Sequence, residues 1–185
     1  MSRPRPLVAL ALCCIGGLAW ARAVNVEPTE YFDERTGHTV ALVRAPLVFL
    51  LGRPRGHEKS PDFISLTACE MDQGGVLAHY FVAYAWTERD PLQQPLHIIL
   101  DEETIDLRPL DSFPADLPAD RVLLSPGGKG TPRAAYAVSR DMLHAIAASS
   151  QVNLSIGDDP QTFKLFDGKK ALILLVQKLE TFKQP

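Results

Sequence analysis

Histidine is the residue of this 185-residue chain best suited to chemistry, because imidazole binds Zn and Cu and titrates near neutral pH. The chain has five histidines, and no two of them stand at the i, i+2 or i, i+4 spacing of a metal-binding pair. His79 and His97 fall in two expected strands, and they would form a Zn or Cu site if these strands were neighbours with Glu70 or Asp101 close by. A single histidine is more typical of a packed or surface position, so the sequence leaves a metal site undecided.

The other candidate groups lack the pattern that their chemistry requires. Cys69 lies in an alternating apolar segment, which favours a buried thiol over a nucleophile. The glycine-rich segment 125–131 has Gly130 after Lys129, where a phosphate-binding loop needs Ser or Thr. The acidic residues 101–103 and 106 lack the order of a calcium loop, and no Gly-x-Ser-x-Gly elbow is present. The sequence therefore predicts no catalytic residue and no cofactor.

The first 23 residues have the composition of a secretory signal peptide. Arg3 and Arg5 precede an apolar run over residues 7–20, and Ala21 and Ala23 supply the small side chains that signal peptidase needs. The run is shorter than the roughly 20 residues that span a bilayer, which argues against a retained anchor. We therefore expect a mature chain of residues 24–185 that is one globular domain without a transmembrane anchor, in the periplasm or outside the cell.

Cleavage at this place would change both the charge and the cysteine content of the chain. It would remove three arginines and no acidic residue, which lowers the formal net charge from −3 to −6. Such a field repels phosphate backbones, so nucleic acid is excluded as a partner. It would also remove Cys13 and Cys14, which leaves Cys69 without a partner for an intramolecular disulfide.

The sequence of the mature chain predicts mainly short strands. Alternating or β-branched apolar residues predict strands over 31–33, 39–43, 47–51, 63–71, 76–87, 96–100, 104–107 and in a hairpin over 152–165. Helices are expected after Ser139, which is a good N-cap, and near Gly168, where Leu172, Leu175 and Leu179 share one face. This pattern predicts an α+β fold that is predominantly antiparallel β, as a sandwich or strongly curved sheet, with two short helices late in the chain.

Residues 109–132 form the longest segment without a regular pattern. Five prolines and three glycines prevent a helix or central strand there. Long irregular segments of this kind are often functional.

A likeness to other proteins is visible near the start of the mature chain. Residues 31–40, with the sequence YFDERTGHTV, followed by residues 46–49, PLVF, resemble the opening of a group of small exported proteobacterial proteins of unknown function. The resemblance implies an envelope location in a Gram-negative bacterium, and it assigns no activity.

Two functional hypotheses remain open at this point. The absence of chemical motifs favours a noncatalytic envelope module, which binds a protein or ligand through a sheet edge or through residues 109–132. The alternative is a small periplasmic hydrolase or a metal-binding protein, whose acid and base groups come from separate strands.

Overall fold

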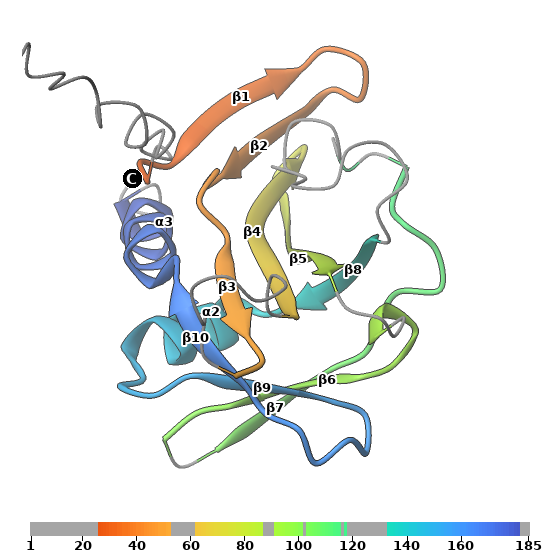
Figure 1. The fold of residues 1–185 in the computed structure, drawn as a ribbon. Coiled ribbons are helices and arrows are strands. Elements are labelled where there is room, and N and C mark those ends of the chain that lie inside the picture. Colours follow the sequence, from red (N-terminus) through yellow and green to blue (C-terminus); the bar gives the residue numbers. More distant parts are fainter. Residues whose placement is uncertain are drawn as a thin grey trace, which may run out of the picture.

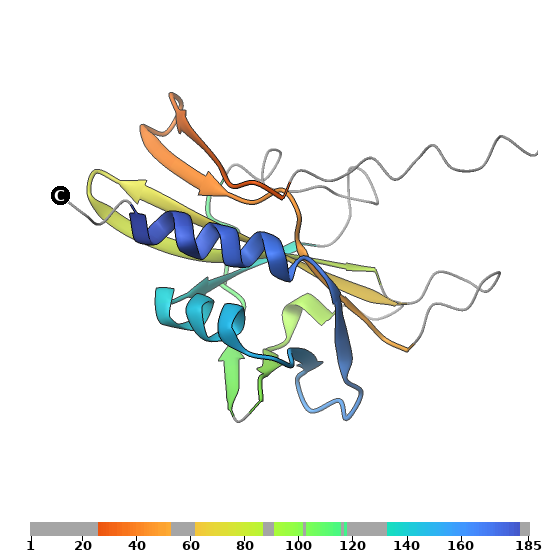
Figure 2. The same ribbon diagram turned by 90° about the vertical axis from the view of Figure 1, so that its left-hand side faces the viewer.

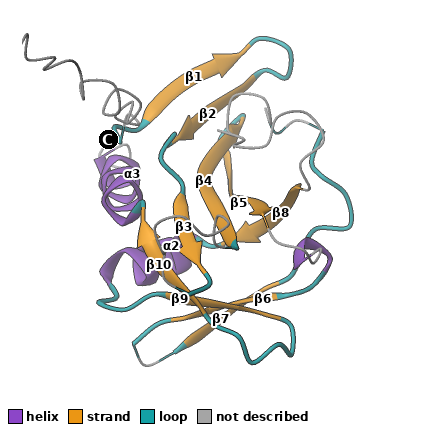
Figure 3. Ribbon diagram, in the orientation of Figure 1, coloured by secondary structure: helices purple, strands orange, loops and turns teal. Residues whose placement is uncertain are grey.

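The structure is a computed structural model, and it describes residues 26–52, 62–86, 91–101, 103–115, 117 and 133–181 (Figures 1 and 3). The strands within these residues are β1 Thr29–Asp33, β2 His38–Leu42, β3 Leu47–Leu50, β4 Phe63–Gln73, β5 Val76–Trp86, β6 Leu96–Ile99, β7 Thr104–Leu107, β8 Arg133–Val138, β9 Asn153–Ile156 and β10 Phe163–Asp167. The helices are α2 Arg140–Ala148 and α3 Lys169–Thr181, with a short 3-10 turn, η1, at Pro91–Gln93.

All ten of these strands belong to one antiparallel sheet that curls but does not close. The order along one path is β1-β2-β4-β3-β10-β9-β6-β7, and β5 pairs with β4 and β8. The long β4–β5 hairpin turns at Gly74 and Gly75, both at positive φ. Figure 1 shows β6, β7 and β9 crossing beneath this hairpin, so two parts of the same sheet face each other.

One edge of β4 is shared by two strands, which splits the sheet. β3 pairs with residues 63–66 of β4 and β2 with residues 69–72. The chain between β2 and β3 leaves the ladder, and Gly168, which precedes α3, packs directly on it. A Cβ at Gly168 would lie 1.9 Å from the carbonyl oxygen of Pro46, and its φ of 94° is also one that favours glycine. Close approach of α3 to the sheet therefore depends on this glycine.

Apolar side chains fill both faces of β4 and β5. The inner core lies between the curled sheet and the two helices, and its members include Phe49, Ile64, Leu66, Phe81, Leu143, Ile146, Leu172 and Leu175. The outer core lies on the opposite face, and its buried members are Val40, Leu42, Cys69, Met71, Val82, Tyr84 and Leu117. Both faces of β5 are thus covered, as its apolar sequence predicts.

The helices form as their sequences predict. Ser139 caps α2, because its hydroxyl accepts a hydrogen bond from the backbone N–H of Met142 at 3.1 Å. Buried residues of α3 recur at helical spacing: Ala171, Leu172, Leu175, Val176 and Leu179. Figure 2 shows α3 lying along one face of the sheet, with α2 beside it. His144 Nδ1, in the middle of α2, lies 3.6 Å from Glu180 Oε1 near the end of α3.

The expected fold class is confirmed: strands are predominantly antiparallel, and two helices come late in the chain. β8 is the strand that the sequence pattern did not predict. No helix among the described residues is long and apolar enough to cross a membrane. The expected signal peptide, residues 1–23, lies outside the described residues.

Candidate functional site

The two histidines considered as a metal pair lie on strands that are not neighbours. His79 is on β5, whose partners are β4 and β8, whereas His97 is on β6, whose partners are β7 and β9. Each has its own carboxylate: His79 Nε2 lies 2.6 Å from Glu70 Oε2, and His97 Nδ1 lies 2.6 Å from Asp106 Oδ1. Across the part of the chain that the structure describes, no three His, Cys, Asp or Glu side chains gather closely enough to hold a metal ion.

Asp101, the other carboxylate considered for that pair, holds a loop instead. Its two oxygens accept hydrogen bonds from the hydroxyl of Ser150 at 2.7 Å, the N–H of Ser150 at 2.6 Å, the hydroxyl of Ser149 at 2.9 Å and the N–H of Gln151 at 2.8 Å. The bonds from Ser150 lead in lowering the pKa of Asp101 to about 2. The carboxylate therefore ties the end of α2 to the turn after β6.

Cys69 is buried, as its strand pattern predicts. Burial raises the pKa of its thiol to about 12, and the backbone of Tyr80 offsets this only in part by hydrogen bonding. A thiol that stays protonated and inaccessible is unsuited to nucleophilic catalysis.

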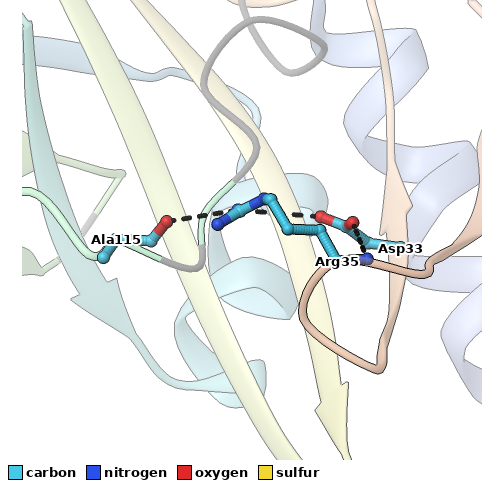
Figure 4. Close-up of polar contacts among 3 residues, drawn as sticks. All are labelled: Asp33, Arg35 and Ala115. Atoms are coloured by element: carbon cyan, nitrogen blue, oxygen red, sulfur yellow. Dashed lines mark hydrogen bonds and ion pairs between the residues drawn. The ribbon is translucent and has the colours of Figure 1, made fainter.

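The described part of the irregular segment 109–132 packs against the sheet. Leu117 is buried in the outer core and Phe113 is half-buried against it, while the N–H of Leu110 donates to the carbonyl of Ala135 at 2.9 Å. Figure 4 shows a further contact: the guanidinium of Arg35, in the β1–β2 turn, donates a hydrogen bond to the carbonyl of Ala115 at 3.3 Å. Asp33 orients this turn by accepting the N–H of Arg35 at 3.0 Å. Residues 109–115 and 117 are thus part of the packed body, and Ser125–Thr131 lies outside the described residues.

The sheet edge is the other expected docking surface, and three strands stand at an edge of the described sheet. β8 is joined by a bridge between Pro109 and Tyr136 to the chain after β7. β7 carries the exposed charge of Asp106, with the charged residues Glu103 and Arg108 on either side, and charges of this kind discourage strand addition. β1 also carries charged residues, Glu30 and Asp33, but it contains neither lysine nor proline and pairs with β2 in an unbroken register of five residues. What favours β1 as a docking edge is the pair of hollows beside it.

Two hollows flank β1, one on each face of the sheet. The register places Glu30, Ala41 and Glu70 in one row across β1, β2 and β4, and side chains in such a row point to the same face. A hollow of about 340 Å³ lies on this face; we call it the acidic hollow, and it is lined by Glu30, Thr39, Ala41, Glu70, Asp72, Gly75, Leu77 and Leu179.

The second hollow, of about 320 Å³, lies on the opposite face and is lined by Thr29, Glu30, Tyr31, Leu42 and Arg44. Thr29 and Leu42 are opposite each other in the register, and alternate residues of a strand point to opposite faces. We call it the Arg44 hollow. An extended segment added beside β1 would place successive side chains alternately toward the two hollows.

The carboxylates of the acidic hollow come from two strands, β1 and β4, and are already partly paired. Lys178 Nζ of α3 lies 3.5 Å from Glu30 Oε2, His79 lies 2.6 Å from Glu70, and Asp72 accepts the N–H of Gly75 at 2.6 Å. Three carboxylates stand against one ammonium and one imidazole, so the acidic groups are in the majority. In the sequence, the signal for this hollow is the pair of acidic residues Glu70 and Asp72, at alternate positions near the end of β4. The pair gains its meaning only from the pairing of β4 with β2, and of β2 with β1.

An exposed aromatic side chain lies at the end of the same face. Phe32 is 60% exposed, and it heads the row Phe32, Thr39, Asp72 and Leu77 across four strands. The edge thus offers main-chain hydrogen bonding, charge and apolar surface together. No family model, curated protein or solved structure was found to match this chain.

Proposed function

We propose that this protein is a noncatalytic binding module, exported to the cell envelope, which docks an extended segment of a partner protein along the edge of β1. The observation that carries the proposal is the combination of an edge strand with a hollow on each of its faces. In strand addition, main-chain hydrogen bonds supply affinity and pockets for alternate side chains supply specificity. The envelope location is supported by the composition of residues 1–23 and by the resemblance of residues 31–40 to small exported proteins.

Site-specific photocrosslinking in the native host tests where a partner docks. The crosslinking residue p-benzoylphenylalanine replaces Phe32 in one variant and Phe166 in a matched control, because Phe166 is also a strand residue and is 66% exposed. We expect one discrete partner to crosslink at position 32 and not at position 166. Equal crosslinking at the two positions, or none at position 32, would rule out docking on β1.

Hydrogen exchange on the purified pair tests the mode of binding. Strand addition gives new hydrogen bonds to the backbone of β1, so amides within Thr29–Asp33 should become protected when the partner binds. Amides of β7 serve as the internal control, since that edge should exchange at the same rate with and without the partner. Protection confined to other parts of the chain would overturn the proposal.

The hydrolase hypothesis has one observation in its favour, the contact between His79 and Glu70. A carboxylate can orient an imidazole as a general base, and Glu70 of this pair lines the acidic hollow. The variant His79→Asn separates the two functions. Retained partner binding supports the binding module, whereas loss of a hydrolytic activity of the mature protein on envelope substrates would favour the enzyme.

A further inference from the structure

We propose that the segment docked on β1 carries a basic side chain opposite Glu30 and an apolar side chain two residues away, opposite Phe32. This inference rests on the proposed function and specifies the chemistry of the partner. The chemistry at each position depends on the face of the sheet to which that side chain of an added strand points.

The geometry of strand addition fixes these positions. Residues directly opposite each other in adjacent strands place their side chains on the same face of the sheet. A residue of the added strand opposite Glu30 therefore points to the face of the acidic hollow, and so does the residue opposite Phe32, because positions two apart share a face. The residues between and beside them point toward the Arg44 hollow.

The acidic hollow suits a long basic side chain in both charge and shape. Glu30, Glu70 and Asp72 outnumber the ammonium of Lys178, so a further cation is attracted there. Leu77 and Leu179 also line the hollow, and they provide apolar surface for the aliphatic stem of a lysine or arginine. An acidic side chain in the same place would be repelled.

The opposite face adds a positive charge, that of Arg44, although Glu30 also lines the hollow there. Arg44 is exposed and lines the hollow beside Thr29 and Leu42. Side chains that flank the basic residue in the partner therefore meet a guanidinium, which binds carboxylates well. A segment with acidic or neutral residues on either side of the basic one fits both hollows.

A second copy of this chain fits the edge less well than a partner of this kind. β1 has the sequence Thr-Glu-Tyr-Phe-Asp, so a self-paired edge would bring no basic side chain to Glu30. The complementary charge therefore comes from a different protein.

The test uses three fluorescently labelled synthetic peptides and the mature protein. Each peptide has nine residues, all threonine except the centre and the positions two residues before and two residues after it. These two positions are valine in all three peptides, so that one valine lies opposite Phe32 in either strand direction, and the centre is lysine, glutamate or threonine. We expect fluorescence anisotropy at low ionic strength to show that the lysine peptide binds at least about tenfold more tightly than the glutamate peptide. Added salt should reduce this difference, because it screens the charges.

Protein variants then assign the preference to the acidic hollow. Glu30→Lys should remove the preference for lysine, and Glu70→Gln, which keeps a hydrogen-bonding group beside His79, should reduce it. Glu103→Lys is the matched control: it makes the same charge change at an exposed residue beside β7, and the preference should remain. Circular dichroism of each variant confirms that it is folded.

The other outcomes separate this inference from the proposed function. Equal binding of all three peptides to the wild-type protein would overturn the charge preference and leave docking on β1 intact. Binding of none of them, together with a partner crosslinked at position 32, would also overturn the inference alone. A crosslink at position 32 to another copy of this chain would replace the basic partner by a homodimer, and absence of any crosslink there would remove the proposed function as well.

Discussion

At neutral pH the thiol of Cys69 is protonated, because burial raises its pKa to about 12. The side chain lies in the outer core beside Val82 and Met71, where a reagent reaches it only after the structure opens. We predict that a thiol reagent labels Cys69 of the native mature protein at least about a hundredfold more slowly than the denatured protein. Mass spectrometry of timed samples measures both rates, and comparable rates would contradict the burial of this thiol.

Asp101 gives a second prediction at the level of single residues. Hydrogen bonds from Ser150, Ser149 and Gln151 lower its pKa to about 2 in the folded protein, below the value of about 3.9 in an unfolded chain. A lowered pKa means that the carboxylate stabilises the fold above about pH 4, and that this contribution is lost as the pH falls toward 2. We predict that Asp101→Asn lowers the free energy of unfolding at pH 7, and that it lowers it less at pH 2.

Urea denaturation of both proteins between pH 2 and pH 7 measures this effect. Ser150→Ala serves as an intermediate variant, because it removes one hydroxyl donor and keeps the backbone N–H. Parallel pH profiles for the wild-type and Asp101→Asn proteins would show that Asp101 does not hold the loop through its charge.

At the level of the elements, the position of α3 depends on a single close contact, between Gly168 and Pro46. A methyl group at Gly168 would meet the carbonyl oxygen of Pro46 at 1.9 Å and would also force alanine to a φ of 94°. We predict that Gly168→Ala lowers the free energy of unfolding by about 3 kcal/mol or more. Gly37→Ala is the matched control, since Gly37 has a φ of 73° with open space around it, and it should cost about 1–2 kcal/mol. Equal losses in thermal denaturation would show that backbone strain alone acts at both positions.

The elements also show what sequence patterns can predict. The β4–β5 hairpin is recognisable because apolar alternation on both sides meets the paired glycines Gly74 and Gly75. β8 is not recognisable, because three of its six residues are alanines with low strand propensity, and its pairing with β5 defines it. The candidate site has the same limit: Glu30 is distant in sequence from Glu70 and Asp72, and the registers of β1, β2 and β4 bring it near them.

For the whole molecule, the sheet separates two apolar cores that share strands β4 and β5. Phe81 belongs to the inner core and the adjacent Val82 to the outer core, so both cores depend on the position of the same strand. The outer core is also where the chain after β7 attaches, through Leu117 and Phe113. Packing of this segment is therefore a property of the complete fold and not of its local sequence.

This arrangement predicts how the native protein resists proteolysis. Leu117 is 3% exposed, so we expect Leu117→Ala to lower the free energy of unfolding by about 2–3 kcal/mol and to speed proteolytic cleavage within residues 109–117. Arg35→Ala removes a contact at the exposed surface, from Arg35 to the carbonyl of Ala115, and should change stability by less than about 1 kcal/mol. Limited proteolysis with mass-spectrometric mapping measures both variants against the wild-type protein. Rapid cleavage of the wild-type chain within residues 109–117 would show that this segment is not packed, and would return it to consideration as a docking surface.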